Sequence, residues 1–142
     1  MKKIINIILL ITWLLLIFIF SAQNEEETIK TSGVFDAVIN IVVKDEVKKP
    51  TAKYIVRKLA HFTEYFILSL LILNVIKDYK VIDYRWLIFT MIMCILYAIS
   101  DESHQLFVDG RVGRAADVLI DSSGSLFALV CYKIVKILKS KR

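Results

Sequence analysis

The stretch IINIILLITWLLLIFIF, residues 4–20, contains no charged side chain and decides the class of this protein. A helix needs about 20 mostly apolar residues to cross a membrane, because it rises about 1.5 Å per residue through a hydrocarbon core about 30 Å thick. Together with its flanking residues, this stretch reaches that length. The next letters, FSAQNEEE, resemble the cleavage site of a signal peptide only faintly. We therefore predict a retained transmembrane helix.

Three more apolar stretches follow, at residues 59–76, 86–99 and 118–135. Hydrophobic residues make up 57% of the chain and its mean hydropathy is +0.62, which exceeds the usual value for soluble domains. A length of 142 residues suits one domain. We predict an all-α membrane protein with one domain, residues 1–142, and four transmembrane helices at about 4–22, 57–76, 85–105 and 116–135.

The basic residues follow the positive-inside rule, by which Lys and Arg accumulate on the cytoplasmic side of a membrane protein. They lie before the first predicted span, in the short loop between the second and third, and at the end of the chain: Lys2, Lys3, Lys77, Lys80, Arg85, Lys133, Lys136, Lys139, Lys141 and Arg142. This pattern predicts a multi-pass protein of the cytoplasmic membrane with both termini in the cytoplasm. The net charge of +5 forms no basic stripe, so nucleic acid is not expected as a partner.

The long connection Ser21–Lys58 is then on the outer side. Apolar residues at Val34, Val38 and Ile41 have helical spacing, which favours a short amphipathic helix on the outer surface or over the bundle. A loosely ordered loop is the alternative. Pro50 ends this segment before the second span begins.

Polar residues interrupt all four spans at a common depth. Counted from the basic inner boundary at the helical rise per residue, His61 and Asp101 each lie about 24 Å up, Asp121 about 22 Å and Ser21 about 27 Å. Charged groups facing lipid cost about 2.5–3.5 kcal/mol each on insertion scales, so we expect them to face the bundle interior. The sequence predicts a polar site in the outer leaflet.

The spacing within each span supports a shared face. The polar residues repeat at intervals of three or four: His61 and Glu64, then Asp101, His104 and Gln105, then Asp117 and Asp121. Side chains three or four apart lie on one side of a helix. The small residues Ser122–Ser125 beside them predict close helix packing.

Several chemistries fit these residues. His61 or His104 suits proton transfer with a carboxylate that orients the imidazole. The histidines with Glu64, Asp101 and Asp121 also suit a metal, although no compact ligand motif names one, and the cofactor stays unknown. A third possibility is an anion site formed by the arginines Arg57, Arg111 and Arg114. In a purely structural alternative, Arg111 and Arg114 pair with Asp117 and Asp121.

Three segments resemble the VanZ-like family of small bacterial membrane proteins, which is named for a teicoplanin-resistance protein. They are FSAQ at the end of the first span, RKLAHFTEYFILSLLI at the start of the second, and YAISDESHQLFVDGRVGRAADVLIDSSGSLF from the third into the fourth. The matching polar positions are Ser21, Gln23, Lys58, His61, Glu64, Asp101, Glu102, His104, Gln105, Arg111, Asp117 and Asp121. Asp109 stands where the family commonly has proline, before the retained Gly110 and Arg111.

The resemblance implies an integral membrane protein of bacteria, linked in some members to lowered glycopeptide susceptibility, and it implies no established reaction. One hypothesis is a binding protein that alters access to a cell-wall precursor. The binding residues would be Ser21, Gln23, Lys58, Glu102, Gln105, Arg111 and Arg114. The alternative is an enzyme acting on an envelope lipid or lipid-linked cell-wall intermediate. Its catalytic residues would be His61, Glu64, Asp101, His104, Asp117 and Asp121.

Overall fold

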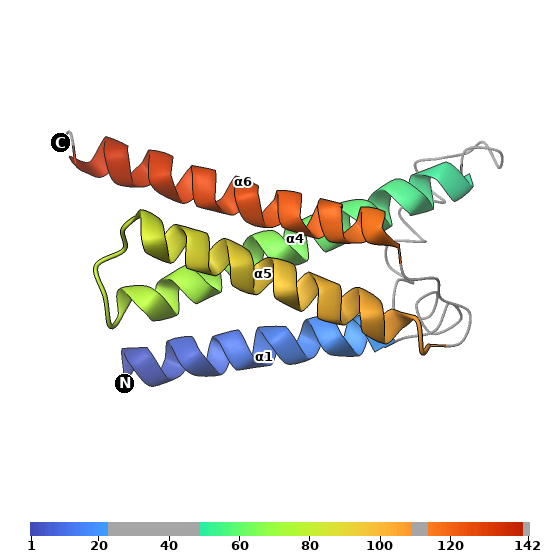
Figure 1. Cartoon of the computed structure of the whole chain (residues 1–142), viewed down its shortest axis with the longest axis horizontal. Coiled ribbons are helices and arrows are strands. Elements are labelled where there is room, and N and C mark those ends of the chain that lie inside the picture. The colour runs from blue at the N-terminus through green and yellow to red at the C-terminus, as the bar shows by residue number, and fades with distance from the viewer. Residues whose placement is uncertain (23–48, 109–113, 141–142) are drawn as a thin grey trace.

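The computed structural model describes residues 1–22, 49–108 and 114–140 (Figure 1). These residues form the four helices α1 (Lys2–Ala22), α4 (Lys49–Lys77), α5 (Tyr84–Gln105) and α6 (Ala115–Ser140). Each helix is long and apolar enough to cross a membrane. The described part of the chain contains no strand, so the prediction of an all-α protein with four such helices is confirmed. The amphipathic helix expected near Val34–Val42 lies outside the described residues.

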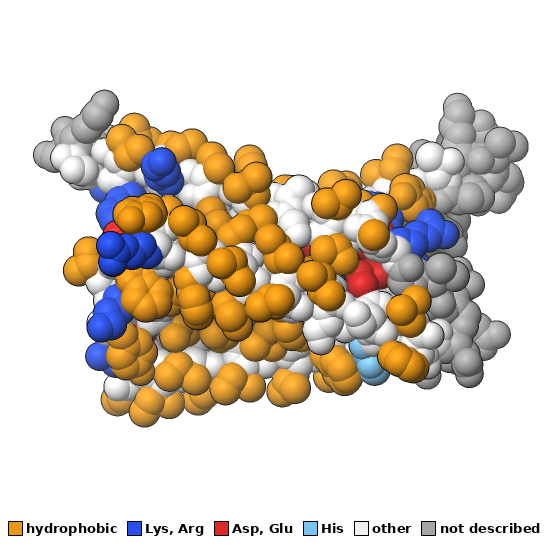
Figure 2. Space-filling model, viewed as in Figure 1, with side chains coloured by type: hydrophobic (Ala, Val, Ile, Leu, Met, Phe, Trp, Pro, Cys, Tyr) orange, Lys and Arg blue, Asp and Glu red, His pale blue; other side chains and the backbone are white. Residues whose placement is uncertain are grey.

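The four helices lie side by side as a bundle, and both termini lie at the same end (Figure 1). Helices α4 and α6 make the most extensive contact and run in the same direction. Figure 2 shows hydrophobic side chains along the length of the visible face, with basic side chains gathered toward its ends. Exposed residues such as Leu15, Leu96 and Leu126 contribute to the apolar surface of the bundle. It is the surface that a helix bundle presents to lipid.

Helix α4 begins earlier than the sequence predicts. The outer connection was expected to reach Lys58, but the helix already starts at Lys49. Pro50, expected to separate the connection from the span, lies instead in the first turn of the helix. Proline is accommodated there because the first amide groups of a helix have no intrahelical partner and its fixed φ suits the helix.

Helix α5 begins at a side-chain cap. The Asp83 carboxylate accepts hydrogen bonds from the backbone amides of Arg85 (2.9 Å) and Trp86 (3.4 Å). Such a cap satisfies amides that would otherwise lack a partner at the helix start. It sets where α5 begins, and therefore how far along the bundle its polar residues lie.

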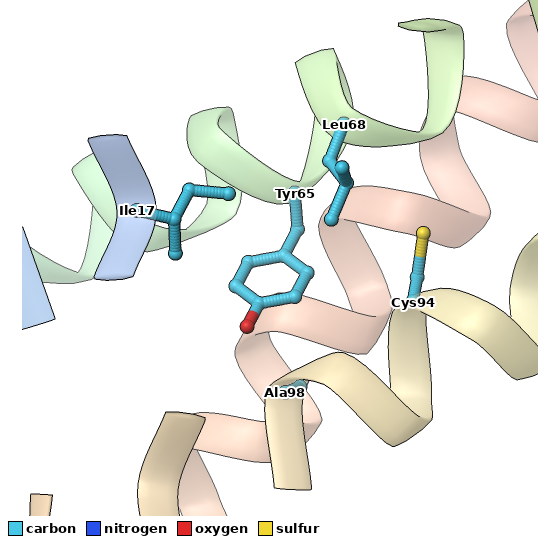
Figure 3. Packing of buried hydrophobic residues seen from close by; sticks show 5 residues of the cluster. All are labelled: Ile17, Tyr65, Leu68, Cys94 and Ala98. Carbon is cyan, nitrogen blue, oxygen red and sulfur yellow. The ribbon is translucent and has the colours of Figure 1, made fainter. Parts of the chain in front are cut away.

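Buried hydrophobic residues from three helices meet in the middle of the bundle: Ile17, Tyr65, Leu68, Cys94 and Ala98 (Figure 3). Hydrogen bonds between the helices also hold this core together, because no water competes for polar groups within lipid. The Tyr97 hydroxyl donates to the Leu14 carbonyl (2.7 Å). Similarly, the Ser69 hydroxyl lies 3.2 Å from the Cys94 sulfur.

Gly124 allows α6 to pack directly against α4. A Cβ atom at this position would lie 2.9 Å from the Phe62 carbonyl carbon, which is closer than such atoms approach. The next residue, Ser125, is fully buried, and its hydroxyl donates to the Tyr65 carbonyl (3.4 Å). The close packing predicted for the small residues at 122–125 is therefore confirmed at these two positions, and it brings the polar turns above them together.

Candidate functional site

Two pairs of charged residues connect α4 and α6 on consecutive turns. Lys58 pairs with Asp117, and His61 Nδ1 lies 3.4 Å from Asp121 Oδ1. Helices α4 and α6 run in the same direction, so a second pair can form one helical turn after the first. The turn corresponds to three residues along α4 and four along α6. Asp121 is fully buried, whereas the Lys58 side chain retains 14% of its exposure. The His61–Asp121 pair is therefore the inner of the two.

Helix α5 adds three buried polar residues to the same end of the bundle, Asp101, Glu102 and Gln105. The Gln105 side-chain amide donates to Asp101 Oδ2 (3.3 Å). The backbone amide of Arg114 donates to Glu102 Oε2 (2.7 Å), which ties the start of α6 to the end of α5. Each carboxylate thus has one oxygen occupied by the protein.

Helix α1 completes the site with Ser21, which is buried beside Asp101. Electrostatic interactions connect the site across helices: Asp121 interacts with His61 and Asp117, and Asp101 interacts with both His61 and Asp121. Residues of all four helices therefore meet at the end of the bundle opposite the two termini.

Several buried atoms of this site have no hydrogen-bond partner among the described residues. They are Ser21 Oγ, His61 Nδ1, Tyr65 OH, Asp101 Oδ1, Glu102 Oε1, and both Oδ1 and Oδ2 of Asp121. A buried polar group without a partner costs about 1–3 kcal/mol, and more when it is charged, so proteins rarely keep one without a reason. Their concentration in one place indicates a binding site.

The site carries more acidic than basic groups. Its buried carboxylates are those of Asp101, Glu102, Asp117 and Asp121, and its paired basic groups are Lys58 and His61. Glu64 and Arg57 also interact with His61 and add one charge of each sign. Even with a protonated imidazole the carboxylates outnumber the cations. The excess negative charge matters because charges interact more strongly at low dielectric than in water.

The structure places the other predicted residues in different surroundings. Glu64 is half-buried and interacts electrostatically with His61. His104 instead stacks on Phe18, with ring centroids 4.6 Å apart, and is not part of the His61–Asp121 pair. Gln23 and Arg111 lie outside the described residues.

Arg114 has an unexpected role. One alternative from the sequence pairs its side chain with Asp117 or Asp121, but among the described residues Lys58 and His61 are the partners of those carboxylates. Arg114 is exposed and reaches the site through its backbone amide. The reason is that it lies just before α6, where a free amide points toward α5.

Tyr65 is a site residue that the sequence analysis missed. It is fully buried, and Figure 3 shows its ring extending from α4 with the hydroxyl toward Ala98, one turn below Asp101. Its hydroxyl interacts electrostatically with Asp101 and Asp121. The signal was its position four residues after His61, on the same face of the helix.

The geometry bears on the chemistries considered. Within the described ranges no three His, Cys, Asp or Glu side chains are grouped so that they could hold a metal ion. The His61–Asp121 pair, in contrast, suits proton transfer, because a carboxylate beside an imidazole orients the ring and stabilises its protonated form.

A model of the VanZ/LLP1 family matches residues 6–136, which is nearly the whole chain. This range includes all of α4 and α5, most of α1 and α6, and every described residue of the site. The chain matches no curated protein and no solved structure.

Proposed function

Because the chain belongs to the VanZ/LLP1 family, we propose that it is a multi-pass protein of the bacterial cytoplasmic membrane whose buried polar site binds a ligand at the outer face. By binding that ligand, the protein would alter the susceptibility of the cell to glycopeptides of the teicoplanin type. The observation that carries the proposal is the set of buried carboxylate oxygens without a hydrogen-bond partner, on Asp101, Glu102 and Asp121. In a cluster that served only to hold the helices together, the carboxylate oxygens would have hydrogen-bond partners within the protein.

The charge distribution supports the outer position of the site. Basic residues such as Lys3, Lys77 and Lys136 belong to the end of the bundle that holds both termini. Lys136 donates to the Ile82 carbonyl in the loop at this end, and Lys3 lies over the Tyr79 ring, 4.5 Å from its centroid. By the positive-inside rule this end is cytoplasmic, so the polar site faces outward.

The test is the antibiotic susceptibility of cells. Wild-type protein and Asp121→Asn are expressed at matched membrane abundance in a glycopeptide-susceptible bacterium, and the minimal inhibitory concentration of teicoplanin is measured. Asp78→Asn is the matched control, because Asp78 accepts a hydrogen bond from Asn6 (2.7 Å) in the loop at the opposite end. We expect wild type and Asp78→Asn to change susceptibility and Asp121→Asn to have no effect. If expression of the wild-type protein left the minimal inhibitory concentration of teicoplanin unchanged, the proposal would be contradicted.

A second candidate is an enzyme that acts on an envelope lipid or lipid-linked cell-wall intermediate. The distance of 3.4 Å between His61 Nδ1 and Asp121 Oδ1 favours it, since this pair has the arrangement of a general base with its orienting carboxylate. Purified protein in nanodiscs containing lipid-linked cell-wall precursor would release product under this hypothesis, and His61→Gln would not. A binding protein leaves the precursor chemically unchanged in both samples.

A further inference from the structure

The buried oxygens of the site define the chemistry of its ligand. This inference rests on the proposed function, because it concerns what the same site binds. From the acidic excess and the unpartnered acceptors we infer that the ligand carries a primary ammonium group, held between Asp121 on α6 and Asp101 on α5.

The charge balance is the first step. The charge of Asp117 is compensated by Lys58. Among the described residues, His61 is the only basic side chain paired with Asp121. No salt bridge to Asp101 or Glu102 is found in the described part of the chain. An anionic ligand would add to this repulsion and a neutral ligand would leave it unchanged. A cationic group is the ligand that lowers the electrostatic energy.

The hydrogen-bonding capacity is the second step. An ammonium group has three donors and no acceptor, whereas the unpartnered atoms of Asp101, Glu102 and Asp121 are acceptors. These three residues are at most 6% exposed, so bulk water does not compensate them as it would surface carboxylates. The hydroxyls of Ser21 and Tyr65 are also buried without a partner and can accept a hydrogen bond as well as donate one.

The neighbouring pair provides an internal example of the same chemistry. One turn farther out, the primary ammonium of Lys58 binds the Asp117 carboxylate between the same two helices. The Asp121 carboxylate lies on the same face of α6, but α4 presents the less basic His61 there. A ligand ammonium at Asp121 would therefore repeat, one turn deeper, a contact that the protein already makes with its own lysine.

A divalent cation fits less well. Metal ions require several oxygen or nitrogen ligands converging at short distance. The described residues include no such group of three. Separate acceptors on α5 and α6 suit the divergent N–H bonds of an ammonium group better than a single point of coordination.

Two sources could supply this group. One is the ethanolamine headgroup of a phospholipid in the surrounding bilayer, and the other is a small amine that enters from the aqueous side. The site lies within helices that span the membrane but close to their ends, so both have access. The ammonium group is common to both sources, and the experiment separates them.

The first arm uses wild-type protein in phosphatidylcholine nanodiscs. Free ethanolamine and free choline are titrated by calorimetry, and phosphatidylethanolamine and phosphatidylcholine of matched chains are compared by native mass spectrometry. We expect ethanolamine compounds to bind about tenfold tighter than their trimethylated counterparts, because a quaternary ammonium has no N–H donor. A preference seen only for the phospholipid identifies the bilayer as the source, and one seen also for free ethanolamine identifies a soluble amine. Equal binding, or no binding of either ethanolamine compound, overturns the inference.

The second arm localises the binding. Asp121→Asn and Asp101→Asn should each abolish the preference for ethanolamine, while Asp78→Asn at the opposite end should retain it. Helicity by circular dichroism identifies any variant that fails to fold, and the two site variants are independent of each other. A preference that persists in a folded Asp121→Asn or Asp101→Asn protein overturns the inference, because the amine then binds elsewhere.

The outcomes distinguish this inference from the function on which it rests. The binding arms use purified protein and need no antibiotic. If ethanolamine compounds show no preference while Asp121→Asn still abolishes the effect on teicoplanin, the site binds another ligand and only the ammonium assignment fails. If the amine binds but wild-type protein leaves susceptibility unchanged, the proposed function fails and the ligand assignment stands.

Discussion

His61 Nδ1 on α4 lies 3.4 Å from Asp121 Oδ1 on α6, and neither atom forms a hydrogen bond within the described part of the chain. The contact becomes an ion pair when the imidazole is protonated, and its carboxylate is fully buried. It also connects the two helices that make the most extensive contact in the bundle. Stability and ligand binding should both respond to changes at this one contact.

We expect the two residues to be energetically coupled. His61→Ala and Asp121→Ala should each destabilise the protein, because removing one partner of a buried pair leaves the other charge uncompensated. The double variant should lose less than the sum, with a coupling energy of about 0.5–3 kcal/mol. The free energy of unfolding measured by denaturant titration in detergent micelles checks this. Strict additivity would show that the contact contributes nothing.

The two histidines should differ in function. His61→Ala should abolish the proposed effect on teicoplanin susceptibility, because it removes the partner of Asp121. His104→Ala should retain it, since His104 stacks on Phe18 and takes no part in the His61–Asp121 pair. The His104 variant should lose only about 0.5–1.5 kcal/mol of stability with that ring contact. Inhibitory concentrations at equal membrane abundance make the comparison, and equal loss in both variants would contradict the assigned positions.

Gly124→Ala should weaken the packing of α4 against α6. The added methyl group would meet the Phe62 carbonyl, which is rigid backbone, so the helices must move apart. The expected loss is about 1–3 kcal/mol in the free energy of unfolding. Ser123→Ala is the matched control: the neighbouring residue is exposed and its hydroxyl binds only within its own helix, to the Ile120 carbonyl (2.6 Å). Its effect should stay within about 0.5 kcal/mol.

The proposed orientation can be measured by cysteine labelling in intact cells. In a background with Cys94→Ala and Cys131→Ala, Phe107→Cys places an exposed thiol just beyond the end of α5, at the end of the bundle that holds the site. Tyr79→Cys places one in the loop at the end that holds both termini. A membrane-impermeant maleimide should label position 107 in intact cells and position 79 only after permeabilisation. The reverse pattern would place the polar site in the cytoplasm.

Much of the fold follows from local properties of the chain. Helix α1 and the apolar parts of α5 and α6 appear where the apolar stretches predict them. The start of α4 differs, because Pro50 was interpreted as a break although the first turn of a helix accommodates it. Ser21, His61, Asp101 and Asp121 were placed at one depth from the helical rise alone, and all four are buried at the same end of the bundle.

The sequence by itself determined how many helices are long and apolar enough to cross a bilayer and how far along each helix its polar residues lie. The physical reasons are that lipid leaves the backbone no hydrogen-bonding alternative to a helix and that the rise per residue is constant. Only the tertiary structure decided which of these residues meet, because spacing along one helix does not determine how that helix is rotated toward its neighbours. That rotation pairs Asp121 with His61, directs His104 toward Phe18, and brings Tyr65 into the site. Gly124 permits it, since no side chain separates α6 from the backbone of α4 at that point.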